Sequence, residues 1–560
     1  MRDQSLQIDQ ATPQDPNGAW PHVNIALLEL QLNFLGAAMH ERYLYLILPN
    51  SYHEHLATKL DSLNGTANRA FNTSVLQGDG YLSCFFGAIA AFTLGERLGR
   101  KKSIIAGTSI MTVGAILMTS SFSLEQMFVG RIILGFVDTG SLCSTCYLTK
   151  LESFGNGINT STAPIWHTET SPPHLRGKLV MFEMMMNIVG FSICNWINYG
   201  LSFAGGAVAW RLPLAFQFVF IVALFATVPW LPESPRWLLY HGRDTEALEV
   251  LSCLQGKAAD DAFVVTQQEE IRYSVQYEKE HQIRWRDLLR PHQGGTKPLR
   301  RLLLGAGTQF IQQFEGINIM SYYLPTVLIT AVGLSNELAR LLTAVNSVTY
   351  LIFSCLSIPL VEKWGRRGLM LLSTASQGLA FLIITVLLRY GSPPDGDRKA
   401  AEASIVFFFL YYIAFGIGIL GVPWLYPTEI NSIAMRTSGA VSTATNWLTN
   451  FIIVEITPIG IQNLGWKFWI VFTVFNAAFM PVIYFLYPET ANRTLEDLDE
   501  YYRNNPSLVV TQDPDAICSN RPLKYVEKEK THLRRAARAS QDLSRDKGRV
   551  VSNEHIENSA

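Results

Sequence analysis

Long apolar segments separated by short polar ones repeat along the chain. A helix that crosses a bilayer needs about 20 apolar residues. Segments of about that length lie at 81–95, 103–122, 178–204, 208–231, 302–330, 340–361, 368–389, 404–426, 437–462 and 466–487. An interrupted segment at 126–166 and an irregular one at 24–48 bring the predicted spans to twelve. The pattern predicts an all-α polytopic membrane protein.

The composition is typical of a membrane protein, and it argues against a nucleic-acid partner, a disulfide framework and a metal site. Of the 560 residues, 48% are hydrophobic and 16% are charged, whereas soluble domains carry about a quarter charged residues. The net charge of −1 argues against nucleic acid as the main partner. The seven cysteines lie mostly in apolar segments, and Cys143 and Cys146 form an isolated C-x-x-C pair without nearby histidines. We therefore expect neither a disulfide framework nor a metal site.

Charge distribution predicts the orientation in the membrane. The basic clusters at 97–102, 232–301, 363–367 and from 521 onward fall on one side of the predicted spans. The positive-inside rule makes that side cytoplasmic, with both termini. Two glycosylation sequons, at Asn64 and Asn72, fall on the opposite side and predict a glycoprotein.

Five regions follow from this arrangement. Residues 1–23 are a polar cytoplasmic segment, and 24–231 and 302–487 are six-helix halves. Between them, 232–301 is a cytoplasmic linker with short amphipathic helices at 246–254 and 269–289. Residues 488–560 are a cytoplasmic tail, predicted to be largely disordered because apolar residues are few.

The two halves repeat their charged motifs. Glu96-Arg-Leu-Gly-Arg-Lys-Lys resembles Glu362-Lys-Trp-Gly-Arg-Arg, and Pro232-Glu-Ser resembles Pro488-Glu-Thr. Glu169 precedes Arg176 by seven residues, and Glu429 precedes Arg436 by the same spacing. Two matched halves are typical of an alternating-access transporter.

Amide side chains interrupt the seventh apolar segment. Gln312, Gln313 and Asn318 lie between long hydrocarbon runs, where an amide costs free energy unless it finds a partner or lines a polar path. On a straight helix Gln312 and Asn318 point in different directions. Gly316 is a poor helix former, so we predict a break there that brings the amides together.

The fifth span carries a polar stripe. Glu183, Asn187, Cys194 and Asn198 share a face within about 60°. Such a stripe normally faces a cavity. Glu183 either takes part in transport or is solvated near the cytoplasmic mouth, seven residues after Arg176.

These motifs, together with Pro232-Glu-Ser-Pro-Arg-Trp, resemble the sugar porter family of the major facilitator superfamily. Gly155-Asn-Gly-Ile-Asn, Arg176-Gly-Lys-Leu and Asn195-Trp-Ile-Asn are similar to its fungal branch. The resemblance covers most of residues 80–500 and implies the twelve-helix major facilitator fold, with two six-helix halves and a cytoplasmic helical linker.

The resemblance also implies roles for individual residues. Gln312, Gln313 and Asn318 would bind sugar hydroxyls, with Tyr322 and Tyr323 as an outer gate. Trp424 would stack on the sugar after a hinge of two prolines and three glycines at 416–427, and Asn446 with Trp447 would complete the pocket. A charged latch between the halves would comprise Arg100, Glu169, Arg176, Glu362, Arg366, Arg367, Glu429 and Arg436.

Two regions depart from the family pattern. The first span lacks the aspartate that takes up the proton in proton-coupled members, which leaves Glu183 and Glu315 as candidate proton carriers. In the fourth span, deleting 137–154 would join Gly130-Arg-Ile-Ile-Leu-Gly-Phe directly to Gly155-Asn-Gly. We therefore interpret 137–154 as an insertion from a retained intron or a gene-prediction error.

The predicted function is transport of a hexose or short saccharide through the plasma membrane by alternating access, either facilitated or coupled to protons. The bilayer, the sugar and candidate protons are the expected partners, and no obligate protein partner is inferred. Because no nucleotide-phosphate loop or catalytic triad is evident, we expect neither an enzyme nor a cofactor. The alternatives are a transporter-like sugar sensor that signals through the tail and an inactive product of mis-splicing. The sequence leaves open the sugar, the coupling and the oligomeric state.

Overall fold

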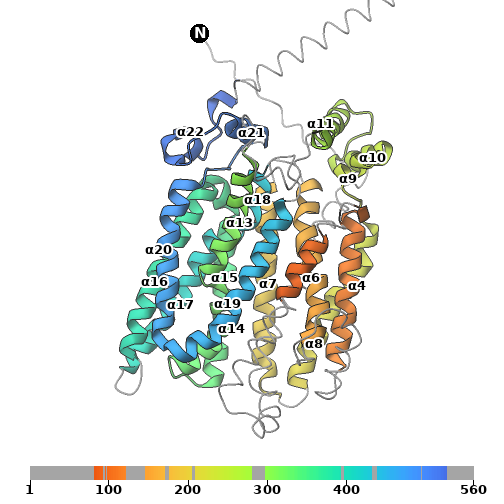
Figure 1. Ribbon diagram of the computed structural model, residues 1–560. Coiled ribbons are helices and arrows are strands. Elements are labelled where there is room, and N and C mark those ends of the chain that lie inside the picture. Colours follow the sequence, from red (N-terminus) through yellow and green to blue (C-terminus); the bar gives the residue numbers. More distant parts are fainter. Residues whose placement is uncertain are drawn as a thin grey trace, which may run out of the picture.

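Helices follow one another along the chain in the computed structural model, as two neighbouring groups (Figure 1). The structure describes residues 81–91, 95, 97–120, 146–170, 176–204, 208–280, 297–391, 397–431, 438–493, 495–525 and 527. Within these ranges the regular elements are α-helices and short 3-10 helices, without strands. The predictions for residues 1–23, the first span, the two sequons, Arg436 and residues 528–560 lie outside the described ranges.

The described part of the first half contains a helix at 81–91 and four longer helices. These are α4 (Arg100–Thr119), α6 (Cys146–Thr170), α7 (Arg176–Leu201) and α8 (Val208–Thr227). The second half contains α13 (Pro298–Phe314), α14 (Ile317–Thr330), α15 (Asn336–Lys363), α16 (Gly365–Gly391), α17 (Arg398–Gly418), α18 (Val422–Ile430), α19 (Ser438–Leu464) and α20 (Phe468–Leu486).

Exposed apolar side chains and buried polar ones identify a membrane protein. Within the described ranges, five helical stretches are long and apolar enough to cross a bilayer: Gly177–Leu201, Asn336–Lys363, Gly365–Gly391, Arg398–Ile430 and Val441–Leu486. Large hydrophobic side chains such as Val219, Ile352 and Leu379 are more than half exposed, whereas Gln309, Gln377 and Asn476 are buried. This distribution suits a lipid-facing surface around a polar interior.

Two spans are broken, both where the sequence predicts it. α13 ends at Phe314 and α14 begins at Ile317, and Gly316 between them has φ +95°, a conformation that favours glycine. A side chain at Gly316 would also meet the ring of Phe381. The second break separates α17 from α18 over residues 419–421, within the predicted glycine- and proline-rich hinge.

The described part of the linker, residues 232–280, forms three helices at the same end of the molecule as the tail helices (Figure 1). They are α9 (Pro235–Tyr240), α10 (Asp244–Gln255) and α11 (Ala262–Glu280). The helix predicted at 246–254 is confirmed. The prediction that the next one starts at 269 is wrong, because the Asp261 carboxylate accepts a hydrogen bond from Phe263 N at 2.8 Å and α11 begins beside it.

Part of the proposed insertion is helical. Residues 146–154 belong to α6 and run without interruption into the fourth span. Ser153 O accepts a bond from Cys84 Sγ on the 81–91 helix at 3.0 Å. Residues 137–145 lie outside the described ranges, and the origin of the segment stays a prediction.

The prediction of a largely disordered tail is wrong for residues 505–525. The tail begins with α21 (Leu495–Arg503) and continues through η4 (Val510–Gln512) and α22 (Pro514–Ile517). Tyr502 is fully buried, and the guanidinium of Arg301 lies 5.0 Å from its ring centroid. Burial raises the pKa of Tyr502, so its phenol stays neutral there. Few apolar residues suffice because aromatic and ionic contacts anchor the segment to α13.

The anchor of the tail is testable by one substitution. Arg301 is fully buried and forms an ion pair with Asp499. We expect Asp499→Ala to destabilise the tail by about 3–5 kcal/mol, because it leaves a buried charge without its partner. Limited trypsin digestion should then cleave residues 495–525 much faster.

The matched control is Asp515→Ala, which removes the half-exposed pair with Lys524. Exposed pairs contribute about 0–1 kcal/mol, so its digestion should resemble that of the wild type. Equal protection of the tail in both variants would contradict the anchor.

Candidate functional site

One group of amides ties two helices, α13 and α19, to the break between α17 and α18. Gln309 Nε2 donates to Pro423 O at 2.8 Å, and Gln312 Nε2 donates to the carbonyls of residues 419 and 420 at 2.9 and 3.0 Å. Asn446 on α19 donates to both glutamine oxygens, at 2.6 Å to Gln309 and 3.4 Å to Gln312. These amides satisfy carbonyls that a broken helix leaves without an intrahelical donor.

A second group of amides lies at the break between α13 and α14 and has hydrogen-bonding atoms that are not used. Asn318 Nδ2 donates to Gln313 Oε1 and, at 2.8 Å, to Asn450 Oδ1. The break at Gly316 therefore brings Gln313 and Asn318 together, as predicted. Among the described residues, no hydrogen bond uses Gln313 Nε2, Asn318 Oδ1 or Asn450 Nδ2. An amide offers donors and acceptors without a charge, so this group can bind a hydroxylated solute.

Aromatic rings join the two halves near these amides. Tyr322 lies 6.1 Å from Tyr81 of the first half, and Tyr81 stacks on Trp447 at 5.9 Å between ring centroids. Tyr323 packs against the same cluster. Trp424, just after the second break, is half-buried. The rings from both halves thus meet where the resemblance implies a gate.

Glu315 faces away from the amide groups. Its carboxylate accepts hydrogen bonds from Thr374 at 2.5 Å and from Gln377 at 3.2 Å, both on α16. Its backbone carbonyl accepts one from Tyr411 at 3.1 Å. These contacts fix the residue just before the break in the seventh span.

Glu183 is buried rather than solvated. Its Oε2 lies 3.0 Å from Nδ1 of His167 on α6, and both side chains are almost completely inaccessible. Of the predicted stripe, Cys194 and Asn198 are also buried, and Asn198 donates to Cys194 Sγ at 3.4 Å. The alternative of a solvated Glu183 at the cytoplasmic mouth is therefore wrong for this conformation.

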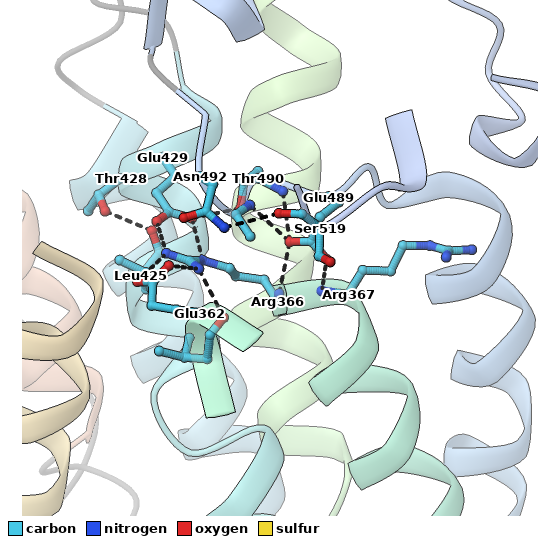
Figure 2. A network of polar contacts seen from close by, with 12 residues as sticks. Glu362, Arg366, Arg367, Leu425, Thr428, Glu429, Glu489, Thr490, Asn492 and Ser519 are labelled. Carbon is cyan, nitrogen blue, oxygen red and sulfur yellow. Dashed lines mark hydrogen bonds and ion pairs between the residues drawn. The ribbon is translucent and has the colours of Figure 1, made fainter. Parts of the chain in front are cut away.

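Charged side chains of the second half form one network at the linker end (Figure 2). Arg366 binds Glu429 with two bonds of 3.0 and 2.6 Å, and it donates to Glu362 at 3.1 Å. Glu489 accepts the backbone N–H groups of Arg366 at 2.8 Å and Arg367 at 3.1 Å, and so caps the start of α16. The Arg367 side chain turns to Tyr484 O on α20.

The first half repeats this geometry. Arg100 binds Glu169 with two bonds of 3.0 and 2.9 Å. Glu233 accepts the backbone N–H groups of Arg100 at 2.9 Å and Lys101 at 3.4 Å, and so caps α4. The repeated sequence motifs therefore fold into equivalent clusters, and Glu233 corresponds to Glu489.

The predicted latch residues pair mainly within each half. The described ion pairs of Arg100 with Glu169 and of Arg366 with Glu362 and Glu429 each join side chains of the same half. Contact between halves occurs at Gly177, where an added Cβ would collide with Glu362 and lie 2.8 Å from Arg366 Nη2. Arg176 starts α7, but its side chain is outside the described part of the chain.

Sequence reasoning missed five residues of these clusters: Gln309, Asn450, His167, Glu233 and Glu489. Helical spacing holds a signal for two of them, because Gln309 is four residues before Gln313 and Asn450 four residues after Asn446. The Pro-Glu-Ser and Pro-Glu-Thr repeat held the signal for the two capping glutamates.

Comparisons with known proteins agree with this architecture. Residues 52–502 match the family described as "Sugar (and other) transporter". The chain is 63% identical over 477 residues to the MFS-type transporter oryC of Aspergillus oryzae, covering 85% of each protein. It is 36% identical over 423 residues to the sugar transporter STL1 of Saccharomyces cerevisiae, covering 75% of this chain and 70% of STL1.

Solved structures show the same fold. The proton:xylose symporter XylE bound to 6-bromo-6-deoxy-D-glucose superimposes with a TM-score of 0.69 at 22% identity. The match covers 87% of this chain and all of the XylE chain.

The broken helices and repeated charged clusters define a multi-pass membrane transporter with the twelve-helix major facilitator fold. The chain belongs to the sugar porter family of the major facilitator superfamily. Its relatives are transporters, so it is a carrier by family rather than an enzyme.

The contribution of the Gln312 hydrogen bonds to stability at the break between α17 and α18 can be measured. Gln312→Ala removes the donor to two buried carbonyls, and each unsatisfied group costs about 1–3 kcal/mol. We expect a clear drop in the melting temperature of the detergent-purified protein. Ser109→Ala serves as the control, because the exposed Ser109 hydroxyl bonds only Ile105 O of its own helix in the described contacts. Equal melting temperatures for the two variants would show that the Gln312 hydrogen bonds do not stabilise the protein.

Proposed function

We propose that the protein carries a hexose or short saccharide across the plasma membrane by alternating access, with both termini in the cytoplasm. The observation that carries the proposal is the Gln313–Asn318–Asn450 group, which keeps donors and acceptors unused beside a helix break. The names of relatives, including a sugar transporter and high-affinity glucose transporters, support the substrate class.

In this proposal the amides replace water around sugar hydroxyls. Gln313 offers donors, Asn318 an acceptor and Asn450 donors, so hydroxyl groups can bridge α13, α14 and α19. Trp424, just after the second break, offers an aromatic ring on which the C–H groups of a sugar can pack. Tyr322 closes the pathway against Tyr81 of the other half.

Rigid halves suit the movement that follows binding. The Arg100–Glu169 and Arg366–Glu429 pairs hold each half together and need not break during transport. The contact of Gly177 with Glu362 and Arg366 separates when the linker end opens. The two conformations are then close in free energy, so that solute binding can shift the balance between them.

Counterflow tests the proposed site. In proteoliposomes preloaded with D-glucose, the wild-type protein should exchange external D-[14C]glucose with saturable kinetics. Gln313→Ala and Asn318→Ala should each raise KM by about 2- to 10-fold, the equivalent of losing a hydrogen bond of about 0.5–1.5 kcal/mol. Gln276→Ala, on linker helix α11, removes an exposed amide that bonds Glu280 and should leave KM unchanged.

Two outcomes would decide against the proposal. Unchanged KM in both site variants would place the solute elsewhere. Binding of D-glucose to the purified protein without any counterflow would favour the sensor alternative over the carrier.

A further inference from the structure

We propose that His167 and Glu183 together bind one exchangeable proton, and that this proton is the co-substrate coupled to solute movement. The proposal rests on the carrier function above and assigns it a proton site. The pair joins α6 to α7 inside the first half, with 3.0 Å between His167 Nδ1 and Glu183 Oε2.

Because the pair is buried, the number of protons it binds decides whether the protein interior holds a net charge. The side chains of His167 and Glu183 are 1% and 0% exposed. Without an exchangeable proton, neutral imidazole and carboxylate carry a net charge of −1, and with one proton the pair is neutral overall. An uncompensated buried charge costs several kcal/mol. One exchangeable proton therefore decides whether this buried pair is neutral or charged.

Among the described residues, no group other than His167 compensates the charge of Glu183. Within the described chain, His167 is the partner of its carboxylate, and Oε1 accepts no hydrogen bond. Arg100, on the neighbouring helix α4, is engaged by Glu169, and Lys178, five residues before Glu183 on α7, is exposed. Glu169 lies two residues beyond His167, about 3 Å along the helix axis. The pair thus lies directly behind the charged cluster at the linker end.

The charged and titratable groups on the packed elements make other contacts or lie at helix ends. No described bond joins any of them to Glu183. They are Arg100, Lys101 and Lys102 on α4, Tyr81 and Cys84 on the 81–91 helix, Arg236 and Tyr240 on α9, Glu337, Arg340, Tyr350, Cys355, Glu362 and Lys363 on α15, Tyr426 and Glu429 on α18 and Glu455 on α19. α8 contributes none among its described side chains.

Close packing links the pair to the hinge of the other half. A side chain at Gly421, in the break between α17 and α18, would meet Met181 and Met184, which lie on either side of Glu183. The carbonyls of that break are held by Gln309 and Gln312. A shift of α7 on protonation would therefore press on the segment that carries Trp424, so proton and solute binding bias the same movement.

Glu315 provides the matched comparison. It is equally buried, yet both carboxylate oxygens already accept hydrogen bonds from Thr374 and Gln377. Those neutral donors hold it as part of the helix break. The geometry therefore selects Glu183 from the two candidate carriers.

The main test measures accumulation and exchange separately. Wild type, Glu183→Gln, His167→Gln and Glu315→Gln are reconstituted in proteoliposomes with an inward proton gradient, using D-[14C]glucose as the probe. The wild type should accumulate glucose above the external concentration. Glu183→Gln mimics the protonated acid, so it should lose accumulation while counterflow continues. His167→Gln should shift the pH dependence of uptake, and Glu315→Gln should still accumulate glucose.

A second readout does not depend on glucose. The melting temperature of each purified variant is measured from about pH 5 to about pH 8, where histidine and perturbed carboxyl groups titrate. The wild type should show a pH-dependent component that Glu183→Gln and His167→Gln both lack and Glu315→Gln retains.

The outcomes separate the two proposals. Wild-type exchange without proton-driven accumulation, accumulation by Glu183→Gln, or loss of accumulation in Glu315→Gln alone each overturns the proton site. Absence of wild-type glucose counterflow defeats the hexose carrier instead. In that case the melting profiles decide, and identical profiles for wild type and Glu183→Gln overturn the pair.

Discussion

The structure depends on one constraint: every polar group inside the hydrocarbon region needs a partner within the protein. The break between α17 and α18 frees backbone carbonyls, and Gln309 and Gln312 supply their donors from α13. Asn446 then fixes both glutamines from α19. A helix break inside the membrane needs such amides as hydrogen-bond donors to its carbonyls. The position of the break therefore depends on how α13, α18 and α19 pack together.

The same requirement accounts for the repeat of the two halves. A carboxylate caps α4 through Glu233 and α16 through Glu489, and each capped helix starts with an arginine that binds a glutamate of its own half. Helix N-termini attract carboxylates because their first N–H groups have no intrahelical acceptor. The ion pairs of these charged clusters thus join side chains of one half, whereas the packing of α7 against α15 and the rings of Tyr81 and Tyr322 join the two halves.

The sequence predicts much of this fold because membrane spans, repeats and helix breakers are local signals. Gly316 and the glycines and prolines of the tenth span mark both breaks without any knowledge of neighbours. Asn450 and His167 were missed because their partners depend on which helices meet, and residue spacing on one helix does not encode that. The ordered tail was missed for a related reason, since Tyr502 and Asp499 become anchors only where Arg301 meets them.

The described buried polar side chains fall into two classes, those whose hydrogen-bonding atoms are all used and those with atoms left unused. Glu315 and Gln312 use their capacity on neighbouring helices, so moving them would cost hydrogen bonds and gain none. Gln313, by contrast, keeps donors unused among the described residues, and one oxygen of Glu183 accepts nothing. An unsatisfied buried group is costly, and a site that binds and releases must tolerate that cost when empty. A passing solute or proton therefore gains most binding free energy from side chains with unused hydrogen-bonding atoms. Fully bonded side chains instead fix the positions of the helices around it.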